Sequence, residues 1–288
     1  METSQVSVEL PKRARACAKF RRLIRAGLIV YLGILLLYLA FENSLVYFPS
    51  RYPSGDWTLA PGVEDAWFDA ADGTKLHGWF LQVEKPRAVV LFCHGNGGSI
   101  AGRRGLLDAL RTLDVSALLW SYRGYGRSEG SAHEAGVVQD ARAARAWLAK
   151  RAGVEESDVV LWGESLGGGV AVDLAQDGAR ALILENTFTS IPDVAHWHYP
   201  WLPARTLMRN RFNSVAKIGK YHGPLLQFHA GADTIVPHDL GRRLFAAANE
   251  PKQFVTIDGA DHNDPRNEQI FVHVHRLLDG LTNARPAE

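Results

Sequence analysis

The chain has 288 residues, with 32 Lys and Arg residues against 31 Asp and Glu residues and a formal net charge of +1. This length is sufficient for one large hydrophobic core, and the balanced charge argues against the basic surface of a nucleic-acid-binding protein. Two cysteines are too few for a disulfide scaffold. We therefore expect a globular domain without a nucleic-acid partner.

The N-terminal region joins a basic segment to an apolar one. Residues 1–22 are rich in Lys and Arg, and residues 23–41 are apolar apart from Arg25. A helix of this apolar length measures about 28 Å, close to the ~30 Å hydrocarbon core of a bilayer. We predict a retained transmembrane signal anchor at residues 23–41. The basic tail should stay in the cytoplasm, which places the rest of this single-pass protein on the extracytoplasmic side.

Two alternatives for the apolar segment remain open. A cleavable signal peptide needs small residues before the cleavage site, whereas cleavage after Ala40 would place Tyr38 at the third position before the cut. A helix of this composition can also lie in a protein core. With a retained anchor, Cys17 and Cys93 would lie on opposite sides of the membrane and could not form a disulfide.

After a predicted connector at residues 42–62, which Pro and Gly residues interrupt, the chain alternates short apolar runs with helix-like stretches. Two runs around the turn signal Asp72-Gly73 predict an antiparallel hairpin, and the later, continuously apolar runs are typical of parallel strands buried on both faces. The predicted strands are 66–70, 76–83, 88–93, 115–120, 159–162, 181–184, 225–228 and 254–257, and the predicted helices are 99–113, 134–150, 165–176, 239–248 and 267–281. This order predicts an α/β fold with a mostly parallel central sheet and helices on both faces.

The most informative motif is Gly163-Glu164-Ser165-Leu166-Gly167, which directly follows the predicted strand 159–162. Gly-x-Ser-x-Gly between a strand and a helix is the pattern of a nucleophile elbow, a sharp turn that presents the serine Oγ above the sheet. Ser165 is therefore the candidate nucleophile. A serine hydroxyl is a poor nucleophile at neutral pH and needs a base that takes its proton.

Candidates for the base and its orienting acid follow two other predicted strands. His262 lies in a polar loop after the last strand, and Asp233 follows the strand 225–228. Because the carboxyl ends of parallel strands meet at one edge of a sheet, we predict that His262 takes the proton and that Asp233 orients its imidazole. The alternative acids are Glu185, at the end of the preceding strand, and Asp261, beside the base.

The loop His94-Gly95-Asn96-Gly97-Gly98 follows the predicted strand 88–93. Acyl transfer builds negative charge on a carbonyl oxygen, which backbone N–H donors stabilise. We predict that the N–H groups of Leu166 and Asn96 form this oxyanion hole and that His94 has a structural role. The alternative, a phosphate-binding glycine loop, lacks the Gly-Lys-Ser/Thr ending.

The longest segment between predicted strands, residues 187–222, is rich in aromatic residues and prolines. It cannot form one straight helix, and we predict a small cap over the site, lined for apolar ligands. His196 and His198 lie two positions apart, but without a third ligand at a matching spacing we expect no metal site. The chemistry predicted for Ser165 needs no cofactor.

Together these motifs resemble the α/β-hydrolase-fold serine hydrolases, and more narrowly the single-pass, membrane-anchored abhydrolase-domain proteins. The resemblance is carried by residues 45–50, 94–98, 122–128, 163–167, 231–237 and 259–263, and by the chain order Ser, Asp, His. It implies a catalytic domain at residues 63–288 that cleaves ester or thioester bonds, through an acyl-enzyme, with lipid or acyl esters as substrates. The same fold also carries peptidases, and a silent, membrane-tethered scaffold is the non-enzymatic alternative.

Overall fold

The computed structural model describes residues 12–283. Residues 1–11 of the predicted basic tail and residues 284–288 of the predicted catalytic domain lie outside this range. The chain divides into two compact units, Met1–Glu42 and Asn43–Glu288. The apolar residues of the first unit are largely exposed, whereas those of the second unit form a buried core.

The first unit consists of most of one long helix, α1 (Lys12–Val46), whose last turn belongs to the second unit. The stretch Lys19–Val46 is long and apolar enough to cross a membrane, and its most apolar part has no buried residues. Leu28, Ile29 and Leu36 are all more than half exposed. Exposed hydrocarbon on this scale is unfavourable in water. A membrane anchor and an N-terminal signal sequence share these properties.

The residues that directly follow α1 are hydrogen-bonded to the rest of the second unit. Strand β1 (Phe48–Pro49) pairs in parallel with β5 (Gly97–Gly98) of the glycine loop. The Phe48 N–H donates to the Asn96 carbonyl at 3.0 Å, and the Tyr52 N–H donates to the Gly126 carbonyl at 2.9 Å. The segment expected to be a connector is thus hydrogen-bonded to two loops at the carboxyl edge of the sheet.

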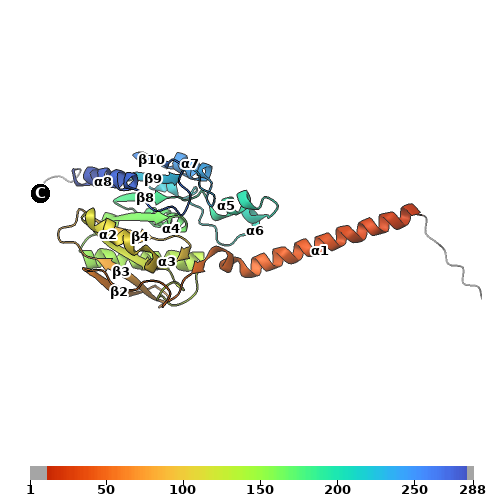
Figure 1. Cartoon of the computed structure of the whole chain (residues 1–288), viewed down its shortest axis with the longest axis horizontal. Coiled ribbons are helices and arrows are strands. Elements are labelled where there is room, and N and C mark those ends of the chain that lie inside the picture. Colours follow the sequence, from red (N-terminus) through yellow and green to blue (C-terminus); the bar gives the residue numbers. More distant parts are fainter. Residues whose placement is uncertain (1–11, 284–288) are drawn as a thin grey trace, which may run out of the picture. The chain divides into compact units, whose positions relative to one another are not determined.

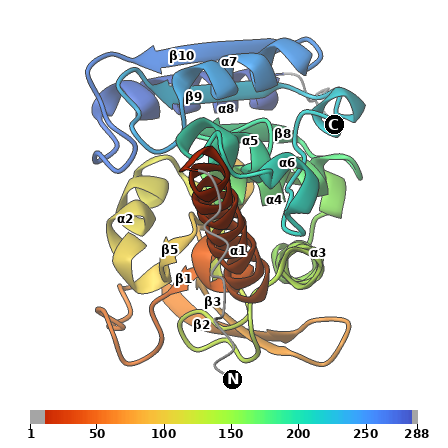
Figure 2. The same cartoon turned by 90° about the vertical axis from the view of Figure 1, so that its right-hand side faces the viewer.

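The second unit is built around an eight-stranded sheet with the order β10-β9-β8-β7-β4-β6-β3-β2 (Figures 1 and 2). Strand β3 pairs antiparallel with β2 and β6, and all the other pairs are parallel, so the predicted hairpin and mostly parallel sheet are confirmed. The strands are β2 (Val63–Asp69), β3 (Lys75–Leu81), β4 (Ala88–Cys93), β6 (Val115–Ser121), β7 (Val159–Glu164), β8 (Ala181–Glu185), β9 (Leu225–Ala230) and β10 (Lys252–Ile257).

Helices cover both faces of this sheet. Helices α2 and α8 share one buried cluster on one face, and α3, α4 and α7 pack on the other. The helices are α2 (Arg104–Thr112), α3 (Glu134–Ala152), α4 (Leu166–Ala175), α5 (Ile191–His198), α6 (Ala204–Leu207), α7 (His238–Ala247) and α8 (Glu268–Asn283). In the predicted cap, the short α5 and α6 pack against each other (Figure 2). Ser190 caps α5 by accepting a hydrogen bond from the Asp193 N–H.

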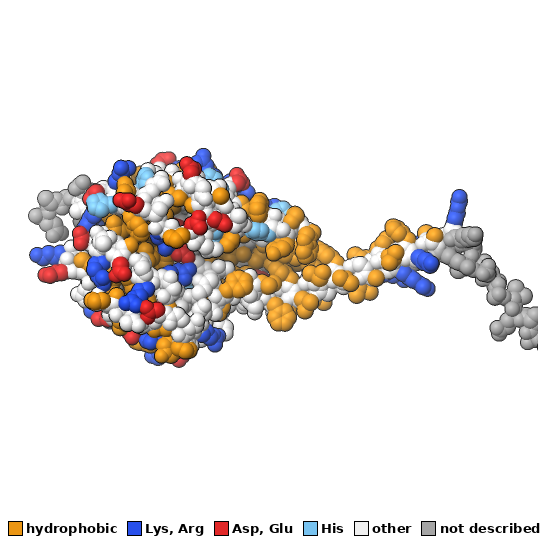
Figure 3. Space-filling model, viewed as in Figure 1, with side chains coloured by type: hydrophobic (Ala, Val, Ile, Leu, Met, Phe, Trp, Pro, Cys, Tyr) orange, Lys and Arg blue, Asp and Glu red, His pale blue; other side chains and the backbone are white. Residues whose placement is uncertain are grey.

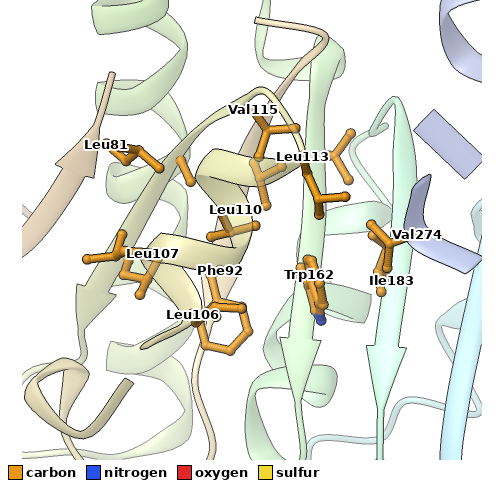
Figure 4. Close-up of a cluster of buried hydrophobic side chains, with 14 of the residues drawn as sticks. Leu81, Phe92, Leu106, Leu107, Leu110, Leu113, Val115, Trp162, Ile183 and Val274 are labelled. Atoms are coloured by element: carbon orange, nitrogen blue, oxygen red, sulfur yellow. The ribbon is translucent and has the colours of Figure 1, made fainter. Parts of the chain in front are cut away.

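Helix α2 is amphipathic because one of its sides packs into the core on one face of the sheet. Leu106, Leu107 and Leu110 lie on one side of α2 and pack with Phe92 and Trp162 from the central strands (Figure 4). Each fully buried large apolar side chain stabilises the fold by about 1.5–3 kcal/mol. This packing holds the central strands rigidly, and with them the loops at their carboxyl ends.

Candidate active site

Ser165 sits at the sharp turn between β7 and α4. Its backbone has φ 53° and ψ −115°, a conformation that a non-glycine residue rarely adopts. The turn is held on both sides: the Ser165 N–H donates to the Glu185 carbonyl at 2.8 Å, and the Thr187 hydroxyl donates to the Ser165 carbonyl at 2.9 Å. The strained serine is therefore fixed by the end of the neighbouring strand β8.

The glycines of the motif allow the chain to pass this turn. A Cβ on Gly163 would lie 2.4 Å from the Gly167 carbonyl oxygen, and one on Gly167 would lie 1.9 Å from the Cys93 carbonyl oxygen. Neither distance is compatible with a side chain unless the backbone moves. Helix α4 can start directly beneath the glycine loop only because these positions carry no side chain.

The structure brings Ser165, His262 and Asp233 together. His262 Nε2 lies 3.0 Å from Ser165 Oγ, and His262 Nδ1 lies 2.7 Å from Asp233 Oδ2. Both the imidazole and the carboxylate are buried, with 7% and 0% of their side chains exposed. The three residues come from the loops after β7, β9 and β10, so the shared carboxyl edge of the sheet positions them.

The carboxylates of the two alternative acids, Glu185 and Asp261, have hydrogen-bond partners other than the His262 ring. Glu185 accepts hydrogen bonds from Trp162 Nε1 at 2.9 Å and from Arg266 Nε at 2.8 Å. Asp261 accepts from the Thr234 N–H and hydroxyl and from the His262 backbone N–H, not from the imidazole. Among these carboxylates, Asp233 is the one bonded to the His262 ring.

The surroundings of Asp233 favour its ionised form. Burial acts to raise the pKa of its carboxyl, but hydrogen bonds from His229 and His262 outweigh burial and hold the pKa well below its usual range. The Ile235 and Val236 N–H groups add hydrogen bonds of 2.9 and 2.7 Å to Oδ1. The acid therefore carries its charge at neutral pH.

His229 is a part of this site that the sequence analysis missed. Its ring is fully buried, and Nε2 lies 2.9 Å from the Val236 carbonyl oxygen and 3.3 Å from Asp233 Oδ2. Because a carbonyl only accepts, Nε2 carries the proton and the ring is a donor beside the carboxylate. Its position four residues before Asp233, at the end of β9, was the available signal.

The glycine loop beside Ser165 is held by its own side chains and by the chain around it. Tyr125 donates its hydroxyl to the Asn96 carbonyl at 2.7 Å, and Asn96 Nδ2 donates to the Val46 carbonyl at 3.0 Å. The backbone N–H groups of Asn96 and Leu166 are not among the hydrogen-bonded donors in the turns and loops of the described chain. Leu166 is the first residue of α4, where helix N–H groups have no partner within the helix.

His94, the first residue of this loop, is buried and in contact with Tyr122. The ring centroids are 4.1 Å apart, and His94 Nδ1 donates to the Gly95 carbonyl at 2.6 Å. Burial, assisted by the charge of Arg103, lowers the pKa of His94 to about 3. The ring is therefore neutral at pH 7, and its contacts are structural.

A partly buried network of four charges lines the same cavity as His262. Glu164 is paired with Arg103 and Arg266, each at 2.7 Å, and Arg266 also pairs with Glu185 at 2.7 Å. Burial alone would raise the pKa of Glu164, but the two guanidinium groups lower it well below its usual range. The network lines a cavity of about 560 Å³, and it ties the residue before Ser165 to the loop that carries His262.

Arg103 and Arg266, which lie 61 and 102 positions from Glu164, were not among the predicted site residues. Neither was Asn186, whose Nδ2 donates to the His262 carbonyl at 3.0 Å and whose Oδ1 accepts from the Ala230 N–H at 2.8 Å. No local pattern signals such contacts. They depend on how distant loops approach one another.

The aromatic side chains of the cap segment divide between core and surface. Phe188 and Phe212 are buried, whereas Trp197, Tyr199 and Trp201 are all more than half exposed. Of the two histidines considered for a metal, His198 contacts the Ile235 carbonyl through Nε2 at 2.8 Å. Residues 12–283 contain no group of three or more His, Cys, Asp or Glu side chains that could hold a metal ion.

Comparisons with known proteins place the chain among its relatives. Residues 84–216 match the family described as serine aminopeptidase, S33. An uncharacterized protein of Mycobacterium tuberculosis is 40% identical over 256 residues, 88% of each chain. An alpha/beta hydrolase domain-containing protein of Arabidopsis thaliana is 34% identical over 83% of this chain and 86% of its own.

More distant proteins extend the comparison. A lysophosphatidylserine lipase of Danio rerio is 32% identical over 69% of this chain and 54% of its own length. The crystal structure of an esterase from Pyrococcus furiosus has a TM-score of 0.68 at 18% identity and covers 82% of this chain and 98% of its own, which shows a common fold. On this sequence identity, this sheet order and this turn at Ser165, the chain belongs to the α/β-hydrolase family.

Proposed function

We propose that this chain is a serine hydrolase that cleaves carboxylic ester or thioester bonds through an acyl-enzyme. The observation that carries the proposal is the unbroken hydrogen-bonded series from Ser165 Oγ through the His262 ring to the ionised Asp233. Nucleophile, base and orienting acid in mutual contact are the requirement for activating a serine hydroxyl. A scaffold without turnover would have no need for this arrangement.

In the proposed reaction, Ser165 Oγ attacks the acyl carbonyl while His262 Nε2 takes the hydroxyl proton. Asp233 holds the imidazole by its Nδ1–H and stabilises the imidazolium that forms. The N–H groups of Leu166 and Asn96 stabilise the oxyanion, assisted by the positive N-terminal end of α4. His262 then returns the proton to the leaving group, and water, activated by the same base, releases the acyl chain.

The proposal includes a location for the enzyme. Residues 23–41 anchor it in a membrane as a single span, the basic tail of residues 1–22 stays in the cytoplasm, and residues 63–288 form the catalytic domain on the extracytoplasmic side. The bare apolar surface of α1 supports this anchor. A membrane location and a relative described as a lysophosphatidylserine lipase favour lipid or long-chain acyl esters as substrates.

A peptidase of the same fold is the second candidate, because the matching family is described as a serine aminopeptidase. Substrate panels separate the two candidates. Acyl esters and thioesters of increasing chain length should be cleaved, with long chains preferred, whereas aminoacyl anilides should remain intact. The reverse pattern would establish the peptidase, and activity confined to short esters would exclude the lipid preference.

The experiment that tests the chemistry uses the full chain in membranes, treated with a fluorophosphonate probe that modifies activated serines. We expect labelling of the native protein and of Ser131→Ala, which changes an exposed serine in a loop, and no labelling of Ser165→Ala. A folded native protein that never reacts with the probe would establish the silent scaffold. Protease added outside intact vesicles of known orientation tests the topology, because only an extracytoplasmic domain would be digested.

A further inference from the structure

An exposed aromatic surface on the cap has no role in the proposed reaction. Trp197, at the end of α5, Tyr199 and Trp201 are 57%, 54% and 55% exposed. Figure 3 shows hydrophobic side chains gathered over this part of the domain. Large aromatic side chains bury 150–250 Å² each when they are covered, so leaving three together in water is unfavourable.

The cap segment that carries this surface is bonded to the start of the second unit. Asn210, three residues after α6, donates through Nδ2 to Asn43 Oδ1 at 2.8 Å and accepts from the Tyr47 hydroxyl at 2.9 Å. The cap is thus bonded to the first residues after position 42. Asn43 directly follows Glu42, the last residue of the first unit, so this bonded part of the cap lies at the start of the second unit. Leu45 and Phe48, in the same entry segment, are 55% and 53% exposed.

The chemistry of this surface fits a lipid bilayer. Trp and Tyr have an apolar body and a polar edge and concentrate at the interface between membrane and water. Residues 187–222 carry five Lys and Arg residues and one acidic residue, Asp193, so phosphate headgroups would meet no net repulsion. Because the domain is tethered, docking is intramolecular, and a weak intrinsic affinity is sufficient.

We propose that Trp197, Tyr199 and Trp201, together with Leu45 and Phe48, form a docking surface that inserts into the interfacial layer of the membrane in which α1 is anchored. This inference rests on the proposed membrane anchor and extends it. The anchor keeps the domain near the bilayer, whereas the docking surface orients it. Docking would hold the cap at the lipid surface, where a long-chain acyl ester would enter.

The distribution of tryptophan makes this inference directly testable. The chain has eight Trp residues, and none lies before Trp57, so α1 contributes no tryptophan fluorescence. The full chain is reconstituted into phosphatidylcholine vesicles whose acyl chains are brominated, and the quenching of tryptophan emission is compared with that in unbrominated vesicles. We expect quenching in the native protein and loss of most of it in Trp197→Phe/Trp201→Phe. The matched control is Trp67→Phe, which changes an exposed aromatic on the edge strand β2 and should leave quenching unchanged.

The same samples separate failure of docking from failure of the proposed function. A protein that does not float with the vesicles would overturn the anchor and the docking together. One that floats and reacts with the fluorophosphonate probe but shows no quenching, or equal quenching in the double variant, would overturn the docking alone. As a second readout, Trp197→Ala/Tyr199→Ala/Trp201→Ala should hydrolyse a vesicle-embedded ester several-fold more slowly and a soluble short ester at the native rate.

Discussion

Helices α1 and α4 are both apolar, but their environments are opposite. All ten residues of α4 are buried between the sheet and the segments that follow β8, whereas the most apolar part of α1 has no protein cover. The difference arises from length and side-chain size. Helix α4 is short and has three consecutive glycines, Gly167 to Gly169, after its first residue, so neighbouring segments can approach it closely. Helix α1 is long enough to span a bilayer and carries large aliphatic side chains. Hydropathy alone does not distinguish a helix that the rest of the chain covers from one that it leaves exposed.

The largest expected effect concerns the chemistry that α4 supports at its N-terminus. Asp233→Asn should lower kcat for ester hydrolysis by about 10⁴-fold, because the imidazole loses the partner that fixes its tautomer and stabilises its charged form. Asp261→Asn, which removes a carboxylate that does not contact the ring, is the matched control and should remain within a few-fold of the native rate. Steady-state kinetics on folded protein measures both. Equal losses in the two variants would contradict the assignment of Asp233 as the acid.

The contrast between the two helices can be tested directly with one glycine from each. Gly167→Ala places a Cβ against the Cys93 carbonyl and should lower the free energy of unfolding by about 3 kcal/mol or more, since the backbone has to move. Gly33 in α1 has no atom within 4 Å of the corresponding position, so Gly33→Ala should leave the stability of the domain unchanged. Denaturant unfolding of the full chain in detergent is the measurement. A stable Gly167→Ala would show that the elbow has room that the structure does not contain.

A charge introduced into α1 tests whether the exposed apolar surface of this helix inserts into a membrane. Leu36 is 68% exposed, and Leu36→Arg should disfavour membrane insertion by about 3 kcal/mol, so that part of the protein moves to the soluble fraction. Leu36→Ile preserves the apolar surface and should remain in the membrane fraction. Fractionation followed by fluorophosphonate labelling reports location and folding together. Unchanged retention of the arginine variant would argue against a membrane-spanning role for α1.

The smallest expected effect is a pH dependence of the free energy of unfolding, caused by His94. The folded-state pKa of His94 is about 3, whereas an unfolded histidine has a pKa of about 6.5. Below about pH 6.5 the unfolded chain therefore binds a proton that the folded protein does not, and stability falls by up to about 1.4 kcal/mol per pH unit. Unfolding measured at about pH 7 and about pH 5 should show a larger loss in the native protein than in His94→Asn.

The remaining dependence in His94→Asn is assigned to His77 and His238, whose pKa values are also lowered by burial. These two side chains are unchanged in the variant, so the difference between the two proteins isolates His94. An identical loss in both would show that the ring is accessible to protons in the folded state.

The sequence by itself determined the elements and the local turns. Buried strands leave continuous apolar runs, and the elbow requires glycines on both sides of Ser165, so both are visible in a single chain. Asp233 and His262 could be found because each follows the end of a parallel strand, and the topology of such sheets brings these ends together. The distances between their side chains were not available from the pattern.

The tertiary structure alone decided which charges surround the candidate site and which aromatic side chains reach the surface. Arg103 and Arg266 meet Glu164 only because their loops converge. The cap has several large aromatic residues, yet Phe212 is buried and Trp201 is exposed. Hydropathy and spacing describe a residue and its close neighbours along the chain, whereas burial and pairing depend on residues a hundred positions away.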